Sequence, residues 1–268
     1  MLVALAVALV PAFIVAPGPW AASMSGGGFG DQRVLVDGLS TSFVDYWSSG
    51  DRNFPPGLER VVDYWLQFHV VKAVIAATLL TVLTTLGVLL WKAFLRAGGI
   101  RAGGRAALAS AGVVVTALAL FSLTAVMANI QGATAPFSSL LSMLPMHAPH
   151  GELADTLDQV RRRLADYPNS GDRTPPAVEV MVSDFSRYHA VIAVAATMVA
   201  AVLLGMSVVS WRRFASTAAS DRRTRRVFRL FGLLSALLAS AVIVVAVANL
   251  TTAADPAPAL LAFFHGGW

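Results

Sequence analysis

The chain has 268 residues, of which 56% are hydrophobic and only 13% are charged, and it carries a formal net charge of +5 and no cysteine. Soluble globular domains carry about 25% charged residues, so this much apolar surface is expected to face lipid, and the absence of cysteine excludes disulfides, thiolate metal sites and a cysteine nucleophile. The basic residues cluster in loops between apolar runs, which indicates membrane topology and argues against a nucleic-acid partner.

Residues 1–22 form an apolar N-terminal segment that has two possible interpretations. The run contains no charge, and Pro17-Gly18-Pro19 should interrupt any helix. It fits a retained anchor helix, which we favour. It also fits a signal peptide, because small residues at Ala21-Ala22-Ser23 form a possible cleavage site, although the usual positive start is missing. N-terminal sequencing of the mature protein would distinguish the two.

Four further apolar stretches predict transmembrane helices. They cover residues 68–91, 107–129, 189–211 and 230–249. About 20 residues of helix cross the roughly 30 Å of a bilayer's hydrocarbon core. Their interiors are rich in Ala, Val and Leu without the alternation of a strand barrel. The predicted fold class is therefore an all-α membrane protein with an additional N-terminal apolar segment.

The loops between these stretches predict the orientation. The loops at 91–107 and 211–229 are strongly basic, whereas residues 17–66 and 131–187 carry more acidic than basic side chains. The positive-inside rule therefore places both basic loops in the cytoplasm and the long segments and the C-terminus outside. Abundant Ala, Arg and Gly with scarce Lys indicate a GC-rich bacterial genome, so the expected location is the bacterial plasma membrane.

An internal repeat is the most informative feature of the sequence. Residue types that are rare in this chain recur at an offset of 120 positions. The pairs are His69 with His189, Trp91 with Trp211, Asn129 with Asn249 and Pro136 with Pro256, while Gly-Asp-Arg at 50–52 recurs at 171–173 with an offset of 121. Such matches in one register predict a tandem duplication of a two-helix transmembrane unit.

Each predicted repeat consists of an outer cap, two spans joined by a basic cytoplasmic loop, and an outer tail. Repeat 1 covers 29–145 with its cap at 31–66, and repeat 2 covers 150–268 with its cap at 152–187. Two crossings return the chain to the same side, so the repeats are parallel and a pseudo-twofold four-helix bundle is expected. Small residues should allow close helix contacts; examples are Ala76, Ala77, Gly87, Ala196, Gly205, Ser235 and Ala239.

Each cap should open with an amphipathic helix and continue into a span. In repeat 2 one helical face carries Leu153, Leu157, Val160 and Leu164; the weaker face of repeat 1 carries Val36, Leu39 and Phe43. A Pro-Pro pair then begins the next helix, because proline suits a first helical turn. That helix should continue through the membrane to Phe94 or Phe214.

Paired polar residues at the outer ends of the spans are the main candidate site. His69 and His189 lie at equivalent positions, and Asn129 and Asn249 end the return helices at the same level. One interpretation is a structural His–Asn hydrogen bond in each repeat. The other is a ligand site, because opposed imidazoles can bind a metal or a haem iron. Lys72 has no basic counterpart and is expected to snorkel to the interface.

Two other groups of residues have both a binding and a structural interpretation. The pattern Met143, Met146, His147, His150 offers thioether and imidazole ligands that suit copper, but these side chains also suit packing at a membrane surface. The Arg-rich loops are topology determinants that could also bind anionic lipid headgroups.

The sequence shows no Ser-His-Asp set, phosphate-binding Gly-rich loop or cluster of membrane carboxylates. The predicted function is therefore a non-enzymatic scaffold or accessory membrane protein without a resident cofactor. Its expected partners are membrane lipid and, through the outer caps, another protein or a second copy. The alternative is an electron-transfer protein that holds haem or metal with His69 and His189. A carrier with a site on the pseudo-twofold axis is a third hypothesis, which the lack of charges and broken helices in the mid-membrane stretches weakens.

Overall fold

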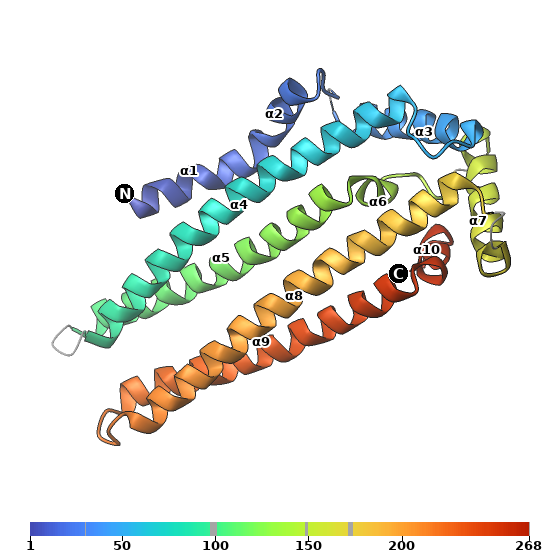
Figure 1. Ribbon diagram of the computed structural model, residues 1–268. Helices are drawn as coiled ribbons and strands as arrows, with labels where there is room; N and C mark the ends of the chain where they lie inside the picture. Colours follow the sequence, from blue (N-terminus) through green and yellow to red (C-terminus); the bar gives the residue numbers. More distant parts are fainter. Residues whose placement is uncertain (30, 97–100, 148–149, 171–173, 268) are drawn as a thin grey trace. The chain divides into compact units, whose positions relative to one another are not determined.

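The computed structural model describes residues 1–29, 31–96, 101–147, 150–170 and 174–267. Ten helices and no strand occur in these residues (Figure 1). The helices are α1 (Leu2–Val15), α2 (Pro17–Met24), α3 (Gln32–Ser49), α4 (Pro56–Arg96), α5 (Ala102–Thr134), α6 (Pro136–Leu141), α7 (Glu152–Ser170), α8 (Pro176–Ser216), α9 (Arg222–Ala254) and α10 (Pro256–Phe264).

Four of these helices, α4, α5, α8 and α9, are long and apolar enough to cross a membrane. The predicted all-α membrane fold class is confirmed at this level. Helices α4 and α8 each have 41 residues, or roughly 60 Å at 1.5 Å per residue, about twice the hydrocarbon thickness. The helix that was predicted to begin at each Pro-Pro pair therefore continues without a break through its span. The N-terminal α1–α2 pair bends by 56° and would be a fifth crossing if the pair counts as one span.

Equivalent helices begin at the same interval along the chain. Helices α7, α8, α9 and α10 each start 120 residues after α3, α4, α5 and α6. Proline supports two of these starts in both halves, because its fixed φ suits a first turn and its missing N–H costs nothing there; these are Pro56 with Pro176 and Pro136 with Pro256. The second Gly-Asp-Arg sequence, at 171–173, lies outside the described residues.

The chain packs as two compact units that cut across the predicted repeats. The first, here called the span unit, contains residues 1–14, 73–127 and 193–248. The second, the cap unit, contains residues 15–72, 128–192 and 249–268. Each unit takes chain from both 120-residue halves.

Two antiparallel helix pairs form most of the span unit, α4 with α5 and α8 with α9 (Figure 1). Glycine allows the close approach within each pair: a Cβ added at Gly112 would lie 3.0 Å from the Trp91 ring, and one at Gly232 would lie 3.0 Å from Trp211 Nε1. The two pairs meet where the rings of Trp91 and Phe231 pack edge to face at 5.1 Å.

Most of the small residues expected at helix contacts do lie there. Ala76, Ala196, Ser235 and Ala239 are buried. The expectation is wrong for Ala77, which is exposed. It is also wrong for Gly205, because a Cβ built there would meet no neighbouring side chain within 4 Å. Composition identifies candidates for close packing, but the rotation of the helix decides which of them face a neighbour.

An apolar core holds the cap unit together. Helix α7 buries Leu157, Val160 and Leu164, with Leu153 packed against them, so its predicted amphipathic face is confirmed. In α3 the buried face is shifted slightly from the prediction. Leu39 and Phe43 are buried as expected, but Leu35 and Tyr46 complete the face, and Val36 lies only half-buried beside it.

Candidate functional site

The two paired histidines lie in the cap unit and make different hydrogen bonds. His189 Nδ1 donates to Asn249 Oδ1 at 2.8 Å, which is the interaction expected within a repeat. His69 Nδ1 instead donates to the carbonyl oxygen of Trp65, one turn earlier in α4, at 2.9 Å. Asn129, the counterpart of Asn249, is buried.

Aromatic rings and a glycine position both imidazoles. The His69 ring packs edge to face on Trp65 at 4.6 Å, and His189 packs on Phe185 in the same way at 4.5 Å. The His69 ring also fills the space beside Gly132, where any Cβ would collide with it. Both rings are therefore fixed by packing and by a hydrogen bond through Nδ1.

A buried carboxylate that the sequence analysis missed lies nearby in α8. Asp184 is 9% exposed, and its Oδ2 accepts a hydrogen bond from the backbone N–H of Ser138 at 2.9 Å. Its Oδ1 lies 3.6 Å from Nη1 of Arg187. Ser138 is in the first turn of α6, where backbone N–H groups lack helical partners. Asp184 therefore caps α6 from a different helix.

Further side chains connect the helices around this carboxylate. Gln131 Nε2 donates to the carbonyl oxygen of Tyr188 at 3.1 Å, which connects α5 to α8. Ser186 Oγ donates to the carbonyl oxygen of Ala253 at 2.7 Å, which connects α8 to α9. These two hydrogen bonds pair backbone carbonyl oxygens and fix α5, α8 and α9 to one another, so their role is structural.

Arg161 connects three parts of the cap unit. Its Nε donates to the carbonyl oxygen of Phe264 in α10, and its Nη2 donates to that of Met146, each at 2.8 Å. Its Nη1 donates to Asp158 at 2.6 Å. The guanidinium therefore holds α7, α10 and the segment after α6 together.

The two methionines and the two histidines of the predicted copper pattern lie in different surroundings. Met143 and Met146 are partly buried against the apolar core, whereas His147 and His150 are exposed. The thioethers thus belong to the packing of the cap unit. Across the residues that the structure describes, no group of three or more His, Asp or Glu side chains is placed to hold a metal ion.

An aromatic groove of about 620 Å³ lies in the cap unit beside Lys72. Tyr64, Trp65 and Phe68 line it together with residues of α2 and α3. Lys72 Nζ lies 5.1 Å from the centroid of the Phe68 ring, which is the distance of a cation–π contact. This contact gives Lys72 a local partner on its own helix.

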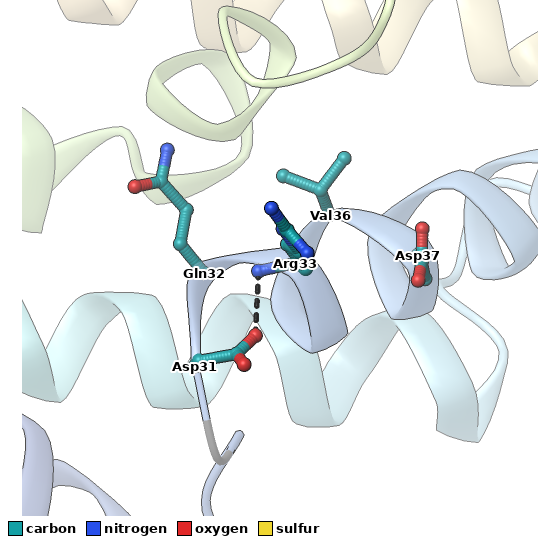
Figure 2. A pocket seen from close by; sticks show the side chains of 5 residues that line it. All are labelled: Asp31, Gln32, Arg33, Val36 and Asp37. Carbon is teal, nitrogen blue, oxygen red and sulfur yellow. Dashed lines mark hydrogen bonds between the residues drawn. The ribbon is translucent and has the colours of Figure 1, made fainter.

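A second hollow, of about 630 Å³, lies at the start of α3. Its lining comes from residues 31–37 of one chain segment (Figure 2). Asp31 Oδ1 accepts the backbone N–H of Arg33 at 2.8 Å and that of Val34 at 3.0 Å. These are the bonds of a helix N-cap, so the hollow follows from the way α3 begins.

No family model, curated protein or solved structure matches the chain. The structure gives a multi-pass arrangement of four apolar helices and a cap unit whose polar side chains mainly fix helices to one another.

Proposed function

We propose that the chain is a non-enzymatic multi-pass membrane protein, a scaffold or accessory subunit, whose cap unit binds a protein partner or a second copy. The cap unit carries this proposal. It is assembled from three separate stretches of chain around one apolar core, and Arg161 and Asp184 fix its helices. A preorganised surface loses little conformational entropy on binding, which favours association.

The orientation and the origin of the chain belong to the same proposal. We place the protein in the bacterial plasma membrane with its Arg-rich loops in the cytoplasm and the cap unit outside; the distribution of arginine supports this. We attribute the two halves to a tandem duplication. The common offset of the helix starts supports it, as do the matching Trp–Gly contacts in the two helix pairs.

Two substitutions in α3 test whether the cap unit carries association. Phe43 is fully buried in the cap core, and Thr41 on the same helix is exposed. Phe43→Asp should disrupt the cap unit and abolish the assembly that co-purifies with wild type in mild detergent, while Thr41→Asp should keep it. Mass determination by light scattering provides the readout. A lone wild-type monomer under several detergents, or a Phe43→Asp variant that still assembles, would contradict the proposal.

A haem- or metal-binding function is the second candidate, and one observation favours it. Both His69 and His189 use Nδ1 for a hydrogen bond to oxygen, the arrangement that leaves Nε2 for a metal. Against it, the edge of the His69 ring that carries Nε2 packs beside Gly132. Absorbance in the Soret region and metal analysis of the purified protein test this candidate, and a colourless, metal-free preparation rules it out.

A further inference from the structure

A cavity of about 520 Å³ lies at the Arg-rich end of the span unit. Trp91, Phe94 and Ala109 line one side of it and come from α4 and α5. The other side comes from the first three turns of α9. Those residues are Arg222, Arg223, Arg226, Val227, Leu230 and Phe231.

The three arginines differ in what they contact. Arg223 Nη2 donates to the carbonyl oxygen of Leu95 at 2.6 Å, and its guanidinium lies 5.7 Å from the Phe94 centroid, so this arginine is held by the protein. Arg222 and Arg226 are exposed and one helical turn apart. Among the described residues, neither has a carboxylate within ion-pair distance.

The nearest acid in sequence, Asp221, is engaged in the helix cap. Its Oδ1 accepts the backbone N–H of Thr224 at 3.1 Å. Arg222 and Arg226 therefore present two positive charges at the rim of a cavity whose remaining wall is largely aromatic and aliphatic. A molecule that fits this pattern has an anionic group and an apolar chain.

We infer that this cavity binds one anionic phospholipid, with its phosphate on Arg222 and Arg226 and its acyl chain against Trp91, Leu230 and Phe231. Guanidinium groups pair with phosphate through two parallel hydrogen bonds, and helices of this length and apolarity have lipid as their surroundings. Among the described residues the other half of the chain does not repeat the arginine part of this site. The residues 120 positions before the three arginines are Ala102, Gly103 and Ala106, which carry no charge.

The test titrates the delipidated full-length protein in detergent with phosphatidylglycerol or phosphatidylcholine, and native mass spectrometry counts the bound lipid. Wild type should retain one phosphatidylglycerol per chain in preference to phosphatidylcholine. The double variant Arg222→Gln/Arg226→Gln should bind it about 25-fold more weakly, because each basic residue near an anionic lipid contributes about fivefold.

The control is Arg212→Gln/Arg229→Gln, which removes the same charge from exposed positions that do not line the cavity. It should bind phosphatidylglycerol as wild type does. The variant Arg222→Lys/Arg226→Lys should bind it with an affinity between those of wild type and the glutamine variant, because lysine keeps the charge but loses the two parallel hydrogen bonds. Equal loss in the control would overturn the inference in favour of non-specific surface charge. Equal binding of the two lipids, or displacement of phosphatidylglycerol by inorganic phosphate, would also overturn it.

Discussion

Asp184 shows how a single residue stabilises the cap unit. Its carboxylate is buried and satisfies the N–H of Ser138 in the first turn of α6. A buried donor without an acceptor costs about 1–3 kcal/mol, so the position should tolerate only side chains that still accept this hydrogen bond.

Replacing Asp184 by alanine should therefore lower the free energy of unfolding by about 2–3 kcal/mol. Asp184→Asn should cost less, because its amide oxygen can still accept from Ser138. Arg187→Ala should cost less than about 1 kcal/mol, because the Arg187 side chain is 59% exposed and its ion pair with Asp184 is 3.6 Å long. Equilibrium unfolding in detergent mixtures measures all three, and an Asp184→Ala variant as stable as wild type would refute this role.

For Tyr46, in contrast to Asp184, removal of the polar group is expected not to lower the free energy of unfolding. Its side chain is buried, and its hydroxyl has no hydrogen-bond partner among the described residues. Burial raises the pKa of this phenol to about 12, with Arg52 acting in the lowering direction. The folded state therefore favours the neutral form, and this part of the stability is present below pH 10 and is lost as the pH rises towards 12.

Tyr46→Phe should consequently be neutral or stabilising by up to about 1 kcal/mol at neutral pH, because a buried hydroxyl without a partner costs free energy. The variant should also lose less stability than wild type between pH 10 and pH 12. Thermal unfolding across this pH range provides the measurement. A marked loss of stability at pH 7 would mean that the hydroxyl has a partner, such as a bound water.

At the residue scale the sequence predicted only part of the hydrogen bonding of the paired histidines. The His189–Asn249 hydrogen bond matches the expectation. His69 differs because Gly132 leaves room for its ring, whereas Thr252 stands at the equivalent position of the second half. Asp184 was overlooked because its counterpart is Tyr64, so the repeat gives no signal for a carboxylate there.

At the scale of elements, the contact between α8 and α9 depends on one glycine. The Trp211 indole lies against Gly232, and Ser207 Oγ donates to the Gly232 carbonyl oxygen at 2.9 Å. Helix pairs in lipid gain stability mainly from close packing and hydrogen bonds between helices. The contact should therefore be sensitive to a single methyl group.

Gly232→Ala should destabilise the protein by about 1–3 kcal/mol, because overpacking forces the tryptophan or the backbone to move. Gly205→Ala on α8 is the matched control, since nothing described lies within 4 Å of its Cβ position. It should be neutral or stabilising by up to about 1 kcal/mol, because alanine favours helix. The unfolding midpoints of the two variants measure these changes. Equal shifts of the midpoint in Gly232→Ala and Gly205→Ala would contradict a role for close packing at Gly232.

Element boundaries followed well from local sequence, whereas helix contacts did not. Pro56 and Pro176 marked the beginnings of the long helices, and apolar periodicity marked the buried face of α7. The glycines with the closest contacts, Gly112 and Gly232, were not singled out, whereas Gly205 was singled out and faces no neighbour. Periodicity identifies a face only when a polar face stands opposite, and lipid-facing helices lack one.

At the scale of the whole molecule, the absence of cysteine allows a clean test of orientation. Ser142 lies after α6 and Ser220 lies between α8 and α9, and both are exposed. A membrane-impermeant maleimide should label Ser142→Cys in intact cells and Ser220→Cys only after lysis, because the Arg-rich loop is expected in the cytoplasm. The reverse labelling pattern would invert the proposed topology.

The division into compact units could not be predicted from the repeat. The internal repeat separates the chain into two consecutive halves that meet at about residue 150. The compact units have a different boundary, which cuts each of the four long helices, near Lys72, Met127, Ile192 and Ala248. Long continuous helices allow this, because different parts of one helix can belong to different units.

The contribution of α10 to the cap core determines the order of biogenesis. Leu260 and Phe264 are fully buried, and the Phe264 carbonyl accepts from Arg161, yet translation delivers both residues after every long helix. The partner surfaces on α7 must wait while the α8–α9 hairpin is synthesised. The cap unit can therefore be completed only after α9 has been synthesised, and a ribosome stalled before α10 leaves the cap core unfinished and sensitive to protease.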